Sequence, residues 1–73
     1  MSPDKMIYMA NQIAGFFATQ PGDHQAADVA GHLKAFWDPR MLAQLYAHAD
    51  AGGAGLVPTV LDAVTALQVP LDA

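Results

Sequence analysis

Apolar residues near the start of the chain recur with the period of an α-helix. The repeating stripe consists of Met6, Met9, Ala10, Ile13, Phe16 and Phe17. Ser2 can cap a helix, and Pro3 suits the first helical position because the N–H that proline lacks would have no partner there. The spacing predicts a helix from about residue 3 to Ala18, which the turn-forming stretch Gln20-Pro-Gly-Asp23 ends.

A second amphipathic segment follows Asp23, whose carboxylate can cap a new helix. Its apolar stripe consists of Ala26, Val29, Leu33 and Phe36, with Trp37 at the edge. The opposite side carries polar or small residues, namely His24, Asp28, Gly31 and Lys34. This pattern predicts a helix that buries Phe36 and exposes its polar face to solvent.

The stretch Phe36-Trp-Asp-Pro-Arg-Met41 marks the boundary between the second and third helices. A residue that precedes proline is pushed out of helical geometry, so the second helix should stop near Trp37. Asp38 can then cap a third helix that has Pro39 at its first position. Trp37 and Leu42 occupy the two positions of a hydrophobic staple, which would fix the angle between the helices.

The third helix is expected to run from Pro39 to about Asp50, where the glycine-rich stretch 51–55 terminates it. Its expected buried residues are Leu42, Leu45, Tyr46 and Ala49.

A fourth helix opens at Pro58 or Thr59, since Thr59 and Asp62 have the spacing of a capping box. Its apolar side consists of Val57, Val60, Leu61, Val64 and Leu67. The tail 68–73 is expected to fray or to dock on a partner as an extended segment.

These elements predict one small all-α domain over residues 1–73, with three to four short helices and an ordered core at about residues 3–67. The chain has 73 residues and no cysteine, yet 53% of its residues are hydrophobic. Such an apolar excess on a chain near the lower size limit for independent stability is typical of a protein interface.

The net charge of −4 opposes binding to nucleic acid. No segment has the pattern of a bilayer span or a secretory signal, so a cytoplasmic protein without membrane contact is expected.

No pattern indicates catalysis or metal binding. His24, His32 and His48 lack the spacing of zinc ligands, and His32 is expected to pair with Asp28 one turn earlier. The glycines at 52–55 lack the preceding strand and the following Lys-Ser/Thr of a phosphate-binding loop. The chain has no Glu or Cys, and its one serine is Ser2. We expect no catalytic, metal-binding or cofactor-binding residue in this chain.

Tyr8, Asn11, Gln12 and Gly15 share the face of the first helix opposite its apolar stripe. Solvation of this face is one explanation. A solvated helix, however, would favour Lys or Glu over an aromatic residue and a helix-destabilising glycine, so contact with another chain is the alternative. Arg40 also has two explanations, as an ordinary surface arginine or as a planar group that pairs with a carboxylate of another subunit.

Three stretches resemble the delta subunits of soluble NAD-dependent formate dehydrogenases, namely Met9-Ala-Asn-Gln-Ile-Ala-Gly-Phe-Phe17, Phe36-Trp-Asp-Pro-Arg-Met41 and Ala51-Gly-Gly-Ala-Gly-Leu-Val-Pro58. The second is the most specific, because capping alone requires neither Trp37 nor Arg40, and the glycine stretch is weak by itself. The family pattern often has a polar residue where this chain has Val57. The resemblance implies that Asn11, Gln12 and the segment from Phe36 to Arg40 belong to a signature surface or hinge. With the first-helix strip, the expected partner interface is Tyr8, Asn11, Gln12, Gly15, Trp37, Asp38 and Arg40.

The resemblance further implies a non-catalytic accessory subunit. The complex of that family is expected to hold a molybdenum or tungsten bis-pterin, iron–sulfur clusters and FMN, all on larger subunits. This chain would assist assembly, stability or maturation of the pterin-binding catalytic subunit, which is its expected partner. Two alternatives stay open: a transient cofactor-insertion factor that is absent from the mature enzyme, and a homodimeric helical adaptor.

Overall fold

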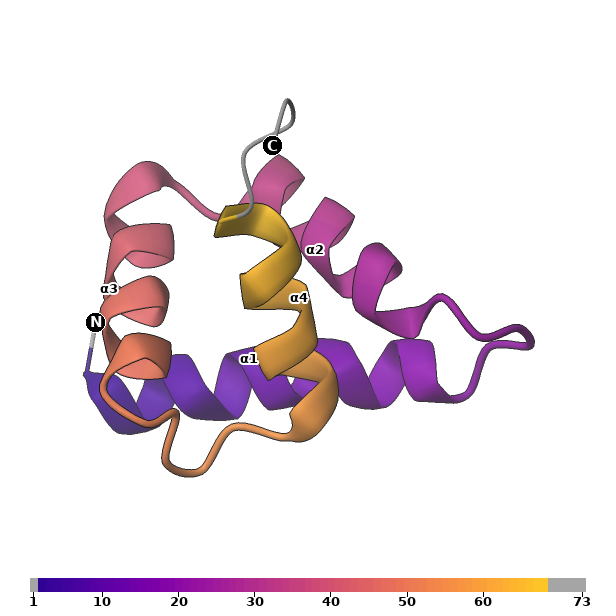
Figure 1. Ribbon diagram of the computed structural model, residues 1–73, viewed down its shortest axis with the longest axis horizontal. Helices are drawn as coiled ribbons and strands as arrows, with labels where there is room; N and C mark the ends of the chain where they lie inside the picture. Colours follow the sequence, from indigo (N-terminus) through magenta and orange to yellow (C-terminus); the bar gives the residue numbers. More distant parts are fainter. Residues whose placement is uncertain (1, 69–73) are drawn as a thin grey trace.

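The computed structural model describes residues 2–68, which fold into four helices. The helices are α1 (Pro3–Ala18), α2 (Gln25–Phe36), α3 (Pro39–Asp50) and α4 (Pro58–Gln68). In Figure 1, α1 runs along the lower edge of the molecule, α3 stands at one end, and α2 and α4 lie above α1. These residues contain no strand, so the predicted all-α fold is confirmed. The tail predicted to fray or dock lies, from residue 69 onward, outside the described residues.

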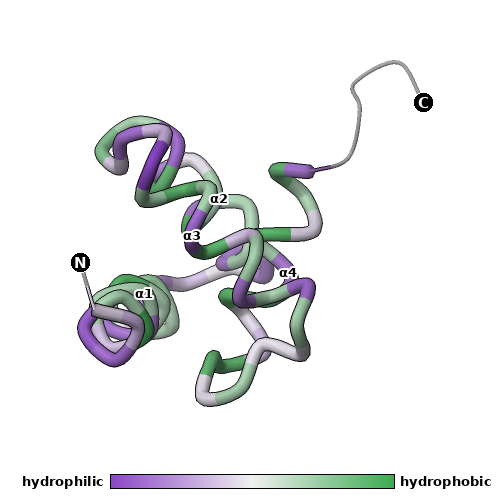
Figure 2. Tube along the Cα trace, turned by 90° about the vertical axis from the view of Figure 1, so that its left-hand side faces the viewer, coloured by the Kyte–Doolittle hydropathy of each residue, from purple (hydrophilic) through white to green (hydrophobic). Residues whose placement is uncertain are grey.

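α4 contacts all three other helices, and its contact with α2 is the most extensive between any two helices. The core consists of Met6, Ala10, Ala14, Val29, Ala30, Leu33, Trp37, Leu45, Leu56, Val60, Ala63 and Val64. Alanines contribute to the core from α1, α2 and α4, and such short side chains allow helix axes to approach closely. Figure 2 shows apolar stretches on all four helices. Within residues 2–68, no helix combines the length and the apolar character that crossing a membrane requires.

Two of the predicted helix starts are confirmed by their caps. Ser2 Oγ accepts a hydrogen bond from the Lys5 N–H at 3.3 Å, and Asp38 Oδ1 accepts one from the Met41 N–H at 2.9 Å. Proline follows each cap at the first helical position. A cap of this kind stabilises a helix by about 1 kcal/mol. The observed bounds of α1 and α3 agree with the predicted ones.

Three local predictions were wrong. α2 begins at Gln25 with His24 at the capping position and no side-chain cap, so Asp23 is not its cap. α4 begins at Pro58, which places Thr59 at the second helical position and excludes the predicted capping box. Asp28 lies 3.7 Å from the ring of His24, one turn earlier, and not beside His32. Each of these predictions rested on a polar residue at suitable spacing, and spacing alone does not determine which contact forms.

Phe36 was predicted to lie on the buried stripe of the second helix and Trp37 at its edge, and the structure reverses this order of burial. Phe36 is 74% exposed, whereas Trp37 is 6% exposed and belongs to the core. α2 ends at Phe36, and Trp37 has extended backbone geometry with φ −89° and ψ 136°. This change of backbone direction turns the indole inward and leaves the preceding phenyl ring outside.

The glycine-rich segment 51–57 ends α3 with a Schellman motif. The Gly53 N–H donates to His48 O at 2.9 Å, and the Gly52 N–H donates to Ala49 O at 3.1 Å, which are the two bonds of this motif. Gly53 has φ +66°, and a Cβ atom at this position would lie 2.5 Å from Cδ2 of Leu61. The predicted terminator is therefore confirmed, and the positive φ of Gly53 favours glycine at this position.

Asn11 anchors the same segment to α1. Its Nδ2 donates to Gly55 O at 2.8 Å, and its Oδ1 accepts from the Val57 N–H at 3.0 Å. From α3, His48 Nε2 donates to Ala54 O at 2.7 Å. Val57 directly precedes α4 and has no polar side chain that could cap the helix. The Asn11 side chain accepts the hydrogen bond of the Val57 N–H, a bond that the third helical residue makes in a capping box. The loop between α3 and α4 is thus fixed by side chains of two other elements.

Candidate partner-docking site

An open groove of about 510 Å³ is formed by α1, α2 and the start of α3. Its lining consists of Met9, Gln12, Ile13, Phe16, Phe17, His32, Phe36, Trp37 and Met41. Only Gln12 and His32 are polar, and no lining residue carries a fixed charge. An open, apolar groove with adaptable methionines suits the apolar side chains of another protein segment.

Aromatic rings continue along the groove from α1 to α2. The ring centroids of Phe16 and Phe17 are 5.1 Å apart, those of Phe17 and His32 are 6.1 Å apart, and those of His32 and Phe36 are 4.6 Å apart. Despite these contacts, Phe16 and Phe36 are 62% and 74% exposed. Large exposed aromatic side chains beside an apolar groove are typical of a binding surface.

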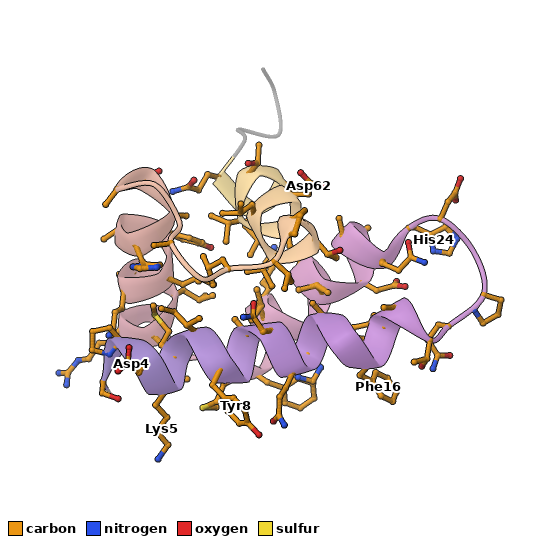
Figure 3. All side chains as sticks on the ribbon, turned by 90° about the horizontal axis from the view of Figure 1, so that it is seen from below. Asp4, Lys5, Tyr8, Phe16, His24 and Asp62 are labelled. Atoms are coloured by element: carbon orange, nitrogen blue, oxygen red, sulfur yellow. The ribbon has the colours of Figure 1, made fainter. Side chains whose placement is uncertain are left out.

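The exposed side of α1 extends this surface. Lys5, Tyr8 and Phe16 project from the side of α1 that faces away from α4 (Figure 3). Tyr8 is 60% exposed, and its hydroxyl accepts a hydrogen bond at 2.9 Å from Nε2 of Gln12, which lines the groove. Gly15 is also exposed, with no atom within 4 Å of the position of a Cβ. Of the first-helix strip predicted from the sequence, Gln12 thus lines the groove and Tyr8 is bonded to it, whereas Asn11 and Gly15 are not among the lining residues.

Comparison with known proteins identifies the family. The profile of the NADH-dependent formate dehydrogenase delta subunit family, FdsD, matches residues 5–64, well over half of the chain. The chain belongs to this family. Among curated proteins, the comparison finds no match.

The family match covers every residue that lines the groove of this delta subunit. It also includes the three stretches that carried the resemblance, so the family predicted from them is confirmed. The matched range extends from the first turn of α1 into α4.

Asn11 and Trp37 of the delta subunit have roles within the chain. Both polar atoms of the Asn11 side chain are engaged by the loop, at Gly55 and Val57. Trp37 belongs to the core and contributes to the groove only as part of its floor. These two residues were predicted to face a partner; within the chain, Asn11 bonds the loop and Trp37 packs in the core.

Asp38 and Arg40 lie at the start of α3. The Asp38 carboxylate is exposed but already accepts the Met41 N–H as the helix cap. Arg40 is exposed, and within residues 2–68 its guanidinium forms no ion pair. Arg40 directly precedes Met41, which lines the groove. Of the predicted residues on α3 and its cap, Arg40 is the one whose side chain remains available to another molecule.

Sequence reasoning missed the most exposed residues of the groove, Phe16 and Phe36, because it placed both on buried stripes. The signal was present in the doublets Phe16-Phe17 and Phe36-Trp37. Consecutive residues on a helix point about 100° apart, so two adjacent large rings cannot both face the same core. No comparable signal indicated His32, which was expected to pair with Asp28 on the helix surface.

In residues 2–68, no three His, Cys, Asp or Glu side chains gather closely enough to hold a metal ion. The exposed ion pair between His24 and Asp28 is ordinary helix-surface electrostatics. The arrangement of side chains in this part of the chain is suited to binding another protein.

Proposed function

We propose that this delta subunit is a non-catalytic accessory subunit that assists assembly, stability or maturation of the pterin-binding catalytic subunit of a cytoplasmic formate dehydrogenase. The larger subunits would hold the molybdenum or tungsten bis-pterin, the iron–sulfur clusters and FMN. This chain has no cysteine that could ligate a cluster. The observation that carries the proposal is the exposure of Phe16 and Phe36 beside an apolar groove in a member of this family.

Burial of these rings against a partner is favourable because it removes apolar surface from water. Covering roughly 100 Å² of one aromatic ring contributes about 2.5 kcal/mol before the ordering costs of binding. Burial of Tyr8, Phe16 and Phe36 together would contribute about 7 kcal/mol toward offsetting those costs. For a chain with so small a core, the same contacts would also stabilise its own fold.

The test is to produce the larger formate dehydrogenase subunits with and without this chain, in tagged form. The proposal expects the tagged chain to co-purify with a larger subunit, and the enzyme made without it to contain less molybdenum or tungsten or to unfold at lower temperature. Absence of co-purification, together with unchanged metal content and unfolding temperature, would contradict it.

The same preparation separates the two alternatives. A permanent subunit stays with the purified active enzyme in fixed stoichiometry, whereas a transient insertion factor is missing from it although its deletion lowers the metal content. A homodimeric adaptor would sediment as a dimer when isolated and would not co-purify with larger subunits.

A further inference from the structure

We infer that the groove is filled by a short amphipathic helix of a larger formate dehydrogenase subunit, with a carboxylate of that helix paired to Arg40. The inference rests on the proposed function and names the chemistry of the partner at the site.

The first argument is the position of the groove relative to α4. The helices α1, α2 and α3 all contact α4, which covers one side of them (Figures 1 and 2). No residue of α4 lines the groove, and the labelled groove residue Phe16 points away from α4 (Figure 3). The helices α1, α2 and α3 therefore have two apolar sides. α4 covers one of them, and within residues 2–68 no helix covers the side with the groove.

A helix that covers the groove needs apolar side chains at helical spacing. α4 meets its neighbours with apolar residues at Val60, Leu61, Val64 and Leu67, a helical stripe over two turns. The groove offers side chains of the same kind, and a helix in a groove is recognised through apolar residues spaced i, i+3, i+4 and i+7. Two methionines, Met9 and Met41, allow the groove walls to adapt to such side chains.

A positive charge next to the groove favours an acidic group on the occupant. Arg40 is exposed, forms no ion pair within residues 2–68, and lies in the first turn of α3, where the helix N-terminus adds positive potential. The other two Lys/Arg residues, Lys5 and Lys34, neither line the groove nor directly adjoin a lining residue in sequence. A carboxylate on the incoming helix would therefore find its partner at Arg40. A second copy of this chain is disfavoured as the occupant, because each copy has a net charge of −4.

The test uses the full-length chain produced with the larger subunits. Phe36→Ala and Arg40→Glu are expected to reduce the amount of chain retained on the larger subunits severalfold. The matched controls are Val57→Ala, at an exposed apolar residue outside the groove, and Lys34→Glu, which makes the same charge change at another exposed cation. Both controls are expected to be retained like the wild type, and circular dichroism verifies that all four variants are folded.

A photo-crosslinking amino acid at position 36 identifies the occupant. The inference expects a cross-link to a helix of a larger subunit that has apolar residues at helical spacing and an Asp or Glu beside them. A cross-link to a second copy of this chain, a cross-link to a segment without this pattern, or no cross-link to a larger subunit would overturn it. So would wild-type retention of both Phe36→Ala and Arg40→Glu.

The two levels of the account can fail separately. If the wild-type chain is not retained by the larger subunits, the proposed function itself fails. If the wild-type chain is retained but the groove variants are retained equally, the function stands and the assignment of the groove is wrong.

Discussion

The side chain of Asn11, on α1, accepts a hydrogen bond from the Val57 N–H directly before α4. Its Oδ1 lies 3.0 Å from the amide nitrogen of Val57. The two residues are 46 positions apart in sequence. Because Val57 cannot cap α4 with its own side chain, this bond joins α1 to the loop that precedes α4. Asn11 thus fixes the loop between α3 and α4 to α1.

Replacing Asn11 tests this coupling. Asn11→Ala removes two hydrogen bonds to backbone groups and is expected to lower the free energy of unfolding by about 1–3 kcal/mol. Urea denaturation followed by circular dichroism measures the change. Gln12→Ala is the matched control, because it removes an exposed neighbouring amide that bonds only to the Tyr8 hydroxyl among the described contacts. Equal stability of the two variants would show that the Asn11 bonds do not hold the loop.

The two glycines Gly53 and Gly31 should respond to alanine in opposite directions. Gly53→Ala places a side chain at φ +66° against Leu61, and the backbone conformation alone should cost about 1–2 kcal/mol. Gly31 lies within α2, with nothing within 4 Å of its Cβ position, so Gly31→Ala should stabilise the chain by up to about 1 kcal/mol. Thermal unfolding of both variants gives the comparison. A shift in the same direction for both would contradict the structure of the loop.

The adjacent residues Phe36 and Trp37 should differ sharply in their effect on stability. Trp37→Ala empties a core position and is expected to cost about 3–5 kcal/mol, enough to leave a domain of this size largely unfolded. Phe36→Ala should change the stability by less than about 0.5 kcal/mol, because the ring is mostly exposed. Circular dichroism in increasing urea distinguishes these outcomes, and a larger loss for Phe36→Ala would reverse the assignment of the two rings.

Asp38 should act through its capping oxygen and not through its charge. Asp38→Asn retains an acceptor for the Met41 N–H and should lower stability only slightly, whereas Asp38→Ala should cost about 1 kcal/mol. The unfolding free energies of the two variants provide the measurement. If Asn destabilises the chain as much as Ala does, the charge and not the hydrogen bond is what matters.

Local features of this fold could be predicted from the sequence because their causes are local. Ser2 and Asp38 cap helices three residues from their partners, and proline follows each of them. The glycines after Asp50 supply the positive φ angles that a helix terminus needs. Each of these predictions depends only on residues within one or two turns of each other.

The remaining features depend on contacts that no local pattern contains. Asn11 appeared to lie on a free face, because its partners Gly55 and Val57 are more than forty residues away in sequence. Phe36 and Trp37 are both large and apolar, so hydrophobic spacing could not determine which ring the end of α2 turns inward. The groove itself exists only where α1, α2 and α3 come together.

Oxidative footprinting of the side chains measures the central claim directly, namely that larger formate dehydrogenase subunits cover the exposed aromatic side of this chain. Hydroxyl-radical labelling of the isolated chain and of the assembled enzyme is compared at Tyr8, Phe16 and Phe36, with His24 as an exposed residue that lines no part of the groove. The account predicts severalfold protection of the three aromatic residues in the enzyme and unchanged labelling of His24. Equal labelling of Phe16 and Phe36 in the two states would contradict it.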